Sequence, residues 1–314
     1  MNSTDTFLII QECPASALDD LGNYLSTTTE EARLDKSGQF FPFMKGIKGN
    51  TERNVRVQLI KLSHRRQCPL SYSDLHRAVL MIGHYLGELL VQNEQGDKVI
   101  RVFDRNRLGS MYKGARYHQT HEGGSIHTDN VNIPEHWEYL LLACLAPAPA
   151  GGESILVDGI RIHATLERDF PEALEILEKN FFWEMRGVAD SLYEAPIITY
   201  TRKGKPLFRH LRPYMESAHE KAGRPLTEEQ LYAVDVLDAL LNSSEFQKRY
   251  KMETGDILLT HDAQVLHGRT CFSDTLSSID YDEYVTDQSQ SPNRQGRKQK
   301  VLKRTMERLW IRSG

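Results

Sequence analysis

Apolar residues recur along this chain at two spacings, one typical of helices and one typical of strands. Helical spacing predicts helices at residues 71–90, with Ser73 or Asp74 as the N-cap, and at 161–177 and 227–241. Short β-branched or apolar runs predict strands at residues 98–104, 139–146, 154–159 and 304–311, and residues 255–268 predict a turn followed by a strand.

Short strands broken by Gly and Pro, with helices confined to inserts, indicate a mainly β (α+β) protein. We expect a double-stranded β-helix, or jelly roll, decorated by helices and spanning residues 1–314 as a single domain. Residues 275–300 are polar and contain few aliphatic side chains. A segment of that length predicts a flexible lid or a surface insert.

Composition narrows the class of protein. The 314 residues carry a formal net charge of −4, which argues against a protein that binds nucleic acid. The four cysteines lie far apart without a CxxC pair, so we expect reduced thiols and a cytoplasmic protein. The N-terminus lacks the features of a signal peptide, and no apolar stretch approaches the ~18 residues that a membrane span needs.

The most informative stretch is GGSIHTDNVN, at residues 123–132. Its His127 and Asp129 are two apart, so on a strand both side chains point to the same face and can converge on one ion. A third ligand must come from elsewhere, and His267 in QVLHGRT is the best candidate. Two histidines and one carboxylate form the facial triad of non-haem Fe(II) oxygenases, which leaves coordination positions open for a co-substrate and O2.

An isolated HxD pair also occurs by chance, and other histidines lie nearby. A zinc site that includes His118 and His121 is conceivable. Zinc hydrolases, however, usually carry their ligands on a helix beside a general-base Glu, and no HExxH is present. His118 and His121 are therefore interpreted as pocket or structural residues.

A 2-oxoglutarate co-substrate would need a buried cation for its distal carboxylate, and Arg suits this because its planar fork binds a carboxylate bidentately. Arg304 and Arg308 in KRTMERLWIR are four residues apart, so on a strand both face one side. Ser154, after GGE, is placed to donate a hydroxyl. The alternative for the two arginines is a solvated basic strand or a phosphate patch.

The chain resembles the TauD/TfdA-type Fe(II)/2-oxoglutarate dioxygenases of the clavaminate synthase-like group. The resemblance extends from about Tyr85 to the C-terminus and rests on four blocks in the family's order: SIHTDN, PAPAGGESILVDG, GDILLTHDAQVLHGRTCF and RTMERLW. The chain departs from the family in two places. His261 and Asp262 stand where relatives often carry Asp then Asn, and the insert between His267 and Arg304 is longer than in the simplest members.

The resemblance implies roles for individual residues. His127, Asp129 and His267 match the iron ligands, Ser154 and Arg304 match the contacts to the distal carboxylate of 2-oxoglutarate, and Arg308 matches a second arginine that faces an anionic substrate in some relatives. No catalytic protein residue is expected beyond the metal centre. Because Asp129 is present, the resemblance implies a hydroxylase or related oxidase and not a halogenase.

The expected reaction uses Fe(II), 2-oxoglutarate and O2, releases succinate and CO2, and oxidises an unactivated C–H bond by hydroxylation, desaturation or cyclisation. The expected substrate is a small polar metabolite, plausibly in natural-product or antibiotic biosynthesis. Candidate substrate-binding residues are Tyr117, His118, Gln119, Asn130 and Arg212. Two alternatives stay open, a non-redox metal-dependent jelly-roll enzyme and an inactive binding protein of the same fold. The oligomeric state is also open.

Overall fold

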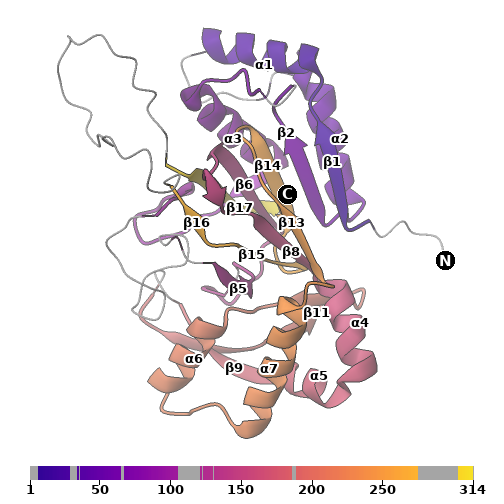
Figure 1. The fold of residues 1–314 in the computed structure, drawn as a ribbon, viewed down its shortest axis with the longest axis vertical. Helices are drawn as coiled ribbons and strands as arrows, with labels where there is room; N and C mark the ends of the chain where they lie inside the picture. Colours follow the sequence, from indigo (N-terminus) through magenta and orange to yellow (C-terminus); the bar gives the residue numbers. More distant parts are fainter. Residues whose placement is uncertain are drawn as a thin grey trace.

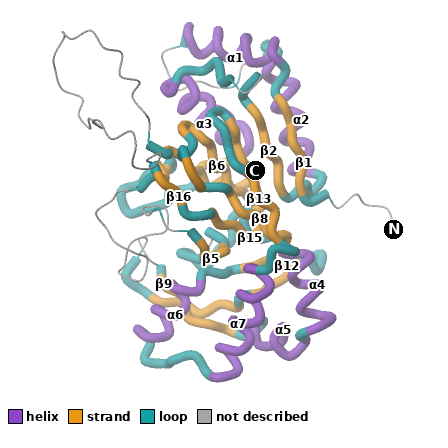
Figure 2. Tube along the Cα trace, in the orientation of Figure 1, coloured by secondary structure: helices purple, strands orange, loops and turns teal. Residues whose placement is uncertain are grey.

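Two facing sheets form the centre of the protein in the computed structural model (Figures 1 and 2). The structure describes residues 6–28, 34, 36–64, 67–104, 121, 123–129, 131–185, 189–274 and 303–313. The larger sheet runs in the order β1 (Leu8–Glu12), β2 (Val57–Lys61), β14 (Asp256–His261), β6 (Tyr139–Ala146), β17 (Thr305–Ser313) and β3 (Gly87–Leu89), and β4 (Ile100–Val102) also pairs with β17. The smaller sheet runs in the order β13 (Gln247–Tyr250), β8 (Ser154–Asp158), β15 (Val265–Arg269) and β5 (Gly124–His127).

Helices cover two sides of these sheets (Figure 1). Three of them pack on the larger sheet: α1 (Ala15–Thr27), α2 (Phe40–Glu52) and α3 (Tyr72–Leu86). A second group forms a separate helical lobe: α4 (Gly159–Asp169), α5 (Pro171–Leu177), α6 (Arg212–Lys221) and α7 (Glu228–Asn242). The remaining strands form two-stranded pairs: β9 (Asn180–Glu184) with β10 (Leu192–Pro196), β11 (Ile198–Tyr200) with β12 (Pro206–Phe208), and β7 (Ala150–Gly151) with β16 (Phe272–Ser273).

Strand β6 shows why an unbroken apolar run forms a central strand. Its sequence YLLLACLA pairs with β14 on one side and with β17 on the other. Leu141 packs toward the α1–α3 helices, whereas Cys144 belongs to the apolar cluster that includes residues of both sheets. Because both faces are buried, the strand has no polar face and its sequence does not alternate.

The predicted helix over residues 161–177 is wrong as a single helix. The structure breaks it at Phe170, between α4 and α5, because Pro171 cannot donate a backbone hydrogen bond within a continuous helix. The predicted cap of α3 is also wrong, since the side chain of Ser71 accepts the hydrogen bond from the backbone N–H of Asp74. The helix predicted at 227–241 is confirmed as α7, and Thr227 closes a capping box with Gln230.

The prediction of a turn followed by one strand over residues 255–268 is wrong in the number of strands. The chain forms β14 in the larger sheet, turns at residues 262–264 and returns as β15 in the smaller sheet. This change of sheet takes the chain from the larger sheet, on which α1–α3 pack, to the smaller sheet, where the site described below lies. The predicted insert at 275–300 lies outside the described residues, and the single-domain organisation stays a prediction. In the described part of the chain, no helix has the length and apolar character needed to cross a membrane.

Two histidines that are largely shielded from solvent, His136 and His261, predict how stability depends on pH. Burial lowers the pKa of His136 to about 4 and that of His261 to about 4. The unfolded chain protonates both near pH 6.5, whereas the folded protein keeps them neutral until about pH 4, so stability is lost as the pH falls below 6.5. We expect the free energy of unfolding in urea to decrease by about 2 kcal/mol per histidine between pH 7.5 and pH 5.

The variant His261→Asn isolates one of these contributions. Its stability should change less between the two pH values than that of the unmodified protein. An equal change in both proteins would contradict the assignment to His261.

Candidate metal centre

Strand pairing brings two distant histidines together. In the antiparallel pair of β5 and β15, His127 lies directly opposite His267, and their ring centroids are 4.6 Å apart. Asp129 follows His127 by two residues, just after β5 ends. Two histidines that are 140 positions apart in the sequence therefore meet through one cross-strand contact.

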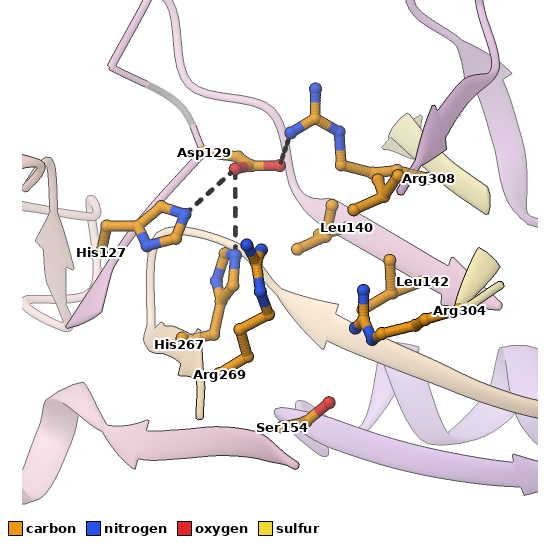
Figure 3. Close-up of a pocket in the computed structure, with 11 residues that line it drawn as sticks. His127, Asp129, Leu140, Leu142, Ser154, His267, Arg269, Arg304 and Arg308 are labelled. Carbon is orange, nitrogen blue, oxygen red and sulfur yellow. Dashed lines mark ion pairs between the residues drawn. The ribbon is translucent and has the colours of Figure 1, made fainter. Parts of the chain in front are cut away.

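The three predicted metal ligands form one buried cluster. Their ligand atoms all lie within 4.8 Å of one another. The Oδ1 atom of Asp129 is 3.6 Å from Nε2 of His127 and 3.8 Å from Nε2 of His267. Figure 3 shows the three side chains converging, with Arg308 approaching Asp129 from the side away from the histidines. Two imidazole nitrogens and one carboxylate oxygen are a donor set that suits Fe(II).

The backbone orients His127 for this role. Its Nδ1 lies 2.7 Å from the carbonyl oxygen of Ser125, and because a carbonyl only accepts, Nδ1 carries the proton. The lone pair of Nε2 then faces the cluster. Ser125 adopts a positive φ of 47°, which costs energy for a residue with a side chain. This strained backbone conformation within β5 directs the carbonyl toward the ring, as expected for a residue that supports a metal ligand.

Charges in the cluster favour the protonation states that bind a cation. Burial alone would raise the pKa of Asp129, but Arg308, His127 and His267 together hold it well below its usual range. Burial, reinforced by His127, lowers the pKa of His267 to about 3. At neutral pH the site therefore presents a carboxylate and a neutral imidazole, the forms that coordinate metals.

Contacts from two distant segments hold the backbone around Asp129. The backbone N–H of Asp129 donates to Oδ1 of Asp262, 3.1 Å away, in the turn after β14. Thr128 exchanges two hydrogen bonds with the backbone of His210: its N–H donates to the carbonyl of His210 at 2.9 Å, and its Oγ1 accepts from the N–H of His210 at 3.1 Å. The helical lobe and the larger sheet therefore both fix the segment that carries the ligands.

A pocket adjoins the cluster and encloses about 460 Å³, part of it open to solvent. Its walls combine the three clustered residues with apolar and cationic side chains: Val102, Leu140, Leu142, Ser154, Gly268, Arg269, Arg304 and Arg308. The structure thus brings the predicted metal-binding and co-substrate residues to one cavity.

Arg304 sits in a tightly packed corner of this pocket. It is 3% exposed, and its guanidinium lies 4.9 Å from the ring centroid of Phe272. Gly152 approaches it so closely that a Cβ there would meet Nε of Arg304 at 3.1 Å, and its φ of 71° also disfavours any larger residue. Ser154 lies nearby on β8. Its hydroxyl donates to the sulfur of Met252, 3.5 Å away, which is a weak acceptor.

Arg308 has a different environment from Arg304. Its Nη1 lies 2.9 Å from Oδ2 of Asp129, and its Nε donates to Gln92 at 2.9 Å. It therefore lines the predicted pocket while pairing with one of the three clustered side chains.

Most of the predicted substrate-binding residues lie outside the part of the chain that the structure describes. Tyr117, His118, Gln119 and Asn130 lie outside the described residues. Arg212 begins α6 and forms ion pairs with Glu216, Asp235 and Asp238 at 2.7 to 2.9 Å, and it does not line the pocket.

Sequence reasoning missed one pocket residue, Arg269. It lies on β15 two residues after His267 and is buried. The rule that identified His127 and Asp129, that residues two apart on a strand share a face, would have found it.

Comparison with known proteins agrees with this geometry. Residues 66–278 match the model of the family described as taurine catabolism dioxygenase TauD, TfdA family. The chain belongs to the TauD/TfdA family. The match includes His127, Asp129, Ser154 and His267 and ends before Arg304, so the resemblance seen in the sequence is confirmed for the segment that carries the three clustered residues.

Two curated proteins resemble the chain over part of their length. FR-33289 synthase of Streptomyces rubellomurinus is 28% identical over 200 residues, which cover 62% of this chain and 57% of that protein. The taurine hydroxylase-like protein SAT17 of Stachybotrys chartarum is 22% identical over 218 residues, covering 65% of this chain and 54% of that protein. The chain thus spans little more than half the length of these relatives.

Solved structures extend the likeness to nearly the whole chain. Asparagine oxygenase in complex with Fe(II), 2S,3S-3-hydroxyasparagine and succinate superposes with a TM-score of 0.67 at 14% identity, covering 96% of this chain and 93% of that one. The non-haem iron oxygenase OrfP with Fe and alpha-ketoglutaric acid gives a TM-score of 0.63 at 14% identity, covering 98% and 94%. The jelly-roll fold predicted from sequence is confirmed.

The hydrogen bond between Thr128 and His210 can be tested directly. Thr128→Val retains the shape of the side chain but leaves the buried N–H of His210 without this acceptor, which should destabilise the protein by about 1–3 kcal/mol. The measurement is urea unfolding at pH 7.5.

Thr260→Val is the matched control, because Thr260 is 1% exposed and its Oγ1 forms no hydrogen bond with a described residue. This variant should match or exceed the stability of the unmodified protein. Equal losses in both variants would contradict a specific role for the contact with His210.

Proposed function

We propose that this protein is an Fe(II)- and 2-oxoglutarate-dependent dioxygenase that oxidises an unactivated C–H bond of a small polar metabolite. The observation that carries the proposal is that the cluster of His127, Asp129 and His267 faces the same pocket as Ser154 and Arg304. A metal site and a buried guanidinium in one cavity are what a co-substrate that chelates iron and carries a second carboxylate requires.

The donor atoms of the cluster fit Fe(II), and in the proposal His127, Asp129 and His267 hold it. When bound, Fe(II) supplies the activation of O2, coupled to decarboxylation of 2-oxoglutarate to succinate. The protein's own part is to position the reactants and to exclude water. Leu140 and Leu142 form an apolar wall of the pocket beside the cluster. No protein acid or base is required, because the cofactor carries the chemistry.

Arg304 and Ser154 hold the distal carboxylate of 2-oxoglutarate in the proposal. Arg304 supplies a permanent charge that burial cannot easily neutralise. The hydroxyl of Ser154 gains a stronger partner when it donates to a carboxylate instead of to the sulfur of Met252. The solved complex of OrfP with Fe and alpha-ketoglutaric acid supports this co-substrate, since that protein shares the fold.

The charge of the pocket favours an acidic substrate. Arg269, Arg304 and Arg308 line it, together with the single carboxylate of Asp129. A divalent ion adds two positive charges and 2-oxoglutarate two negative ones, so an excess of two positive charges remains. A substrate with an anionic group would neutralise it. Asparagine oxygenase and OrfP have each been solved in complex with a hydroxylated amino acid, which supports hydroxylation of an amino-acid-like metabolite, plausibly in natural-product biosynthesis.

The remaining expectations are part of the proposal. They are a single oxygenase domain over residues 1–314, a lid at 275–300, a small-molecule substrate without nucleic acid or membrane as partner, and a cytoplasmic location, which suits the four free cysteines. A non-redox metalloenzyme or an inactive binding protein of this fold would hold a metal without consuming O2.

The first test is succinate formation. Protein purified without oxygen and supplied with Fe(II) and 2-oxoglutarate should release succinate only when O2 is added, and a mixture of acidic metabolites should stimulate the rate. His267→Ala removes one of the three proposed ligands and should abolish the signal. Succinate is measured by mass spectrometry. Metal binding without any succinate would favour the non-redox alternative.

A second test concerns the co-substrate. Loss of a charged hydrogen-bonding partner costs about 1.5–3 kcal/mol, so Arg304→Gln should raise the KM for 2-oxoglutarate roughly 10- to 150-fold. Arg312→Gln is the control, because Arg312 lies on β17, which begins just after Arg304, but is exposed and outside the pocket. Arg312→Gln should retain the unmodified KM. An unchanged KM in Arg304→Gln would remove Arg304 from the co-substrate site.

A further inference from the structure

The two carboxylate oxygens of Asp129 have different partners. Oδ1 faces His127 and His267 at 3.6 and 3.8 Å. Oδ2 accepts a hydrogen bond from the indole Nε1 of Trp310 at 3.0 Å and lies 2.9 Å from Nη1 of Arg308. One oxygen is therefore directed into the cluster, and the other is bound on the side of the larger sheet.

The indole of Trp310 is itself held in place. Trp310 is 1% exposed on β17 and stacks on Trp137, with ring centroids 4.2 Å apart and an angle of 25° between the planes. The guanidinium of Arg308 covers the ring at 4.9 Å. A fully buried ring packed on both sides cannot turn its N–H away from Asp129 without displacing its neighbours.

We infer that Trp310 is a positioning residue for the metal centre: its indole N–H, together with Arg308, holds Oδ2 of Asp129 away from the ion, so that Oδ1 alone binds it. The inference rests on the proposed function. An aspartate that binds through one oxygen takes one coordination position, whereas one that binds through both takes two. Three ligand atoms then leave three positions, two for the chelating co-substrate and one for O2.

Hydrogen-bonding partners of metal ligands typically contribute 10- to 100-fold to metal affinity, because they fix the ligand in its binding orientation. Without the indole donor, the Asp129 carboxylate can rotate and lose this orientation. Sequence reasoning did not assign Trp310 any role at the site.

The test is a titration with Mn(II), followed by the electron paramagnetic resonance signal of the free ion. Trp310→Phe should raise the Kd about 10- to 100-fold. Trp137→Phe is the matched control, because it shortens the other ring of the same stack, and no described residue accepts a hydrogen bond from its Nε1. Its Kd should stay within about twofold of the unmodified value, since no partner of a ligand is lost.

An isosteric replacement separates the lost hydrogen bond from lost packing. Incorporation of β-(3-benzothienyl)alanine at position 310 retains the fused ring and replaces the N–H by sulfur, so a variant that folds like the unmodified protein should show the same rise in Kd. An unchanged Kd in this protein, or equal increases in Trp310→Phe and Trp137→Phe, would overturn the inference.

The proposed function fails in a different way. If the unmodified protein does not bind Mn(II), or if His267→Ala does not weaken binding, the metal centre itself is wrong. If binding depends on His267 but not on the N–H of Trp310, only the role of Trp310 is wrong.

Discussion

The antiparallel pairing of β5 with β15 is the interaction on which the candidate metal centre depends. It sets His127 opposite His267, and β8 holds the other edge of β15 in register. Neighbouring strands are spaced at about 4.8 Å, so two imidazoles on one face of such a pair meet without any loop having to close over them. Asp129 reaches the same point because it is only two positions after His127 in the sequence. A slip of one residue in this register would turn His267 to the opposite face of the sheet.

The electrostatics of the site depend on the other sheet. The histidines come from the smaller sheet, whereas Arg308 and Trp310, which bind the far oxygen of Asp129, come from β17 of the larger one. A buried carboxylate stays ionised only beside such partners. The apolar cluster between the sheets therefore serves the metal centre as well as stability, because it holds the two halves of the site at the correct separation.

The sequence predicted the parts of the site that follow from short-range geometry. His127 and Asp129 are two apart, and Arg304 and Arg308 are four apart, so one rule about strand faces identified both pairs. The structure brings these residues together with His267 in one cavity, and their roles in binding stay predictions.

The contacts that hold the ligands could not be predicted in the same way. Asp262 binds the backbone of Asp129 at a turn that is hard to recognise in the sequence, since residues 262–264 contain neither Gly nor Pro. The bonds between His210 and Thr128 join main-chain atoms and a hydroxyl 82 residues apart, and such contacts leave no periodic pattern. Pro171, by contrast, was a signal in the sequence that should have divided the predicted helix.

Different residues hold the backbone of the segment that carries Asp129 and set the charge of the pocket, except that Arg308 lines the pocket and also pairs with Asp129. His210 contacts Thr128 through main-chain atoms, while Nε2 of its side chain lies within hydrogen-bond distance of Oδ1 of Asp238, 2.8 Å away, within the helical lobe. The ligand segment therefore depends on the path of the chain in that lobe and not on a particular side chain at position 210. The cations of the pocket are side chains on β15 and beside or within β17, where a substitution need not move the backbone. Substitutions of Arg269 or Arg304 would therefore change the charge of the pocket while the arrangement of His127, Asp129 and His267 is retained, whereas a substitution of Arg308 would also remove a partner of Asp129.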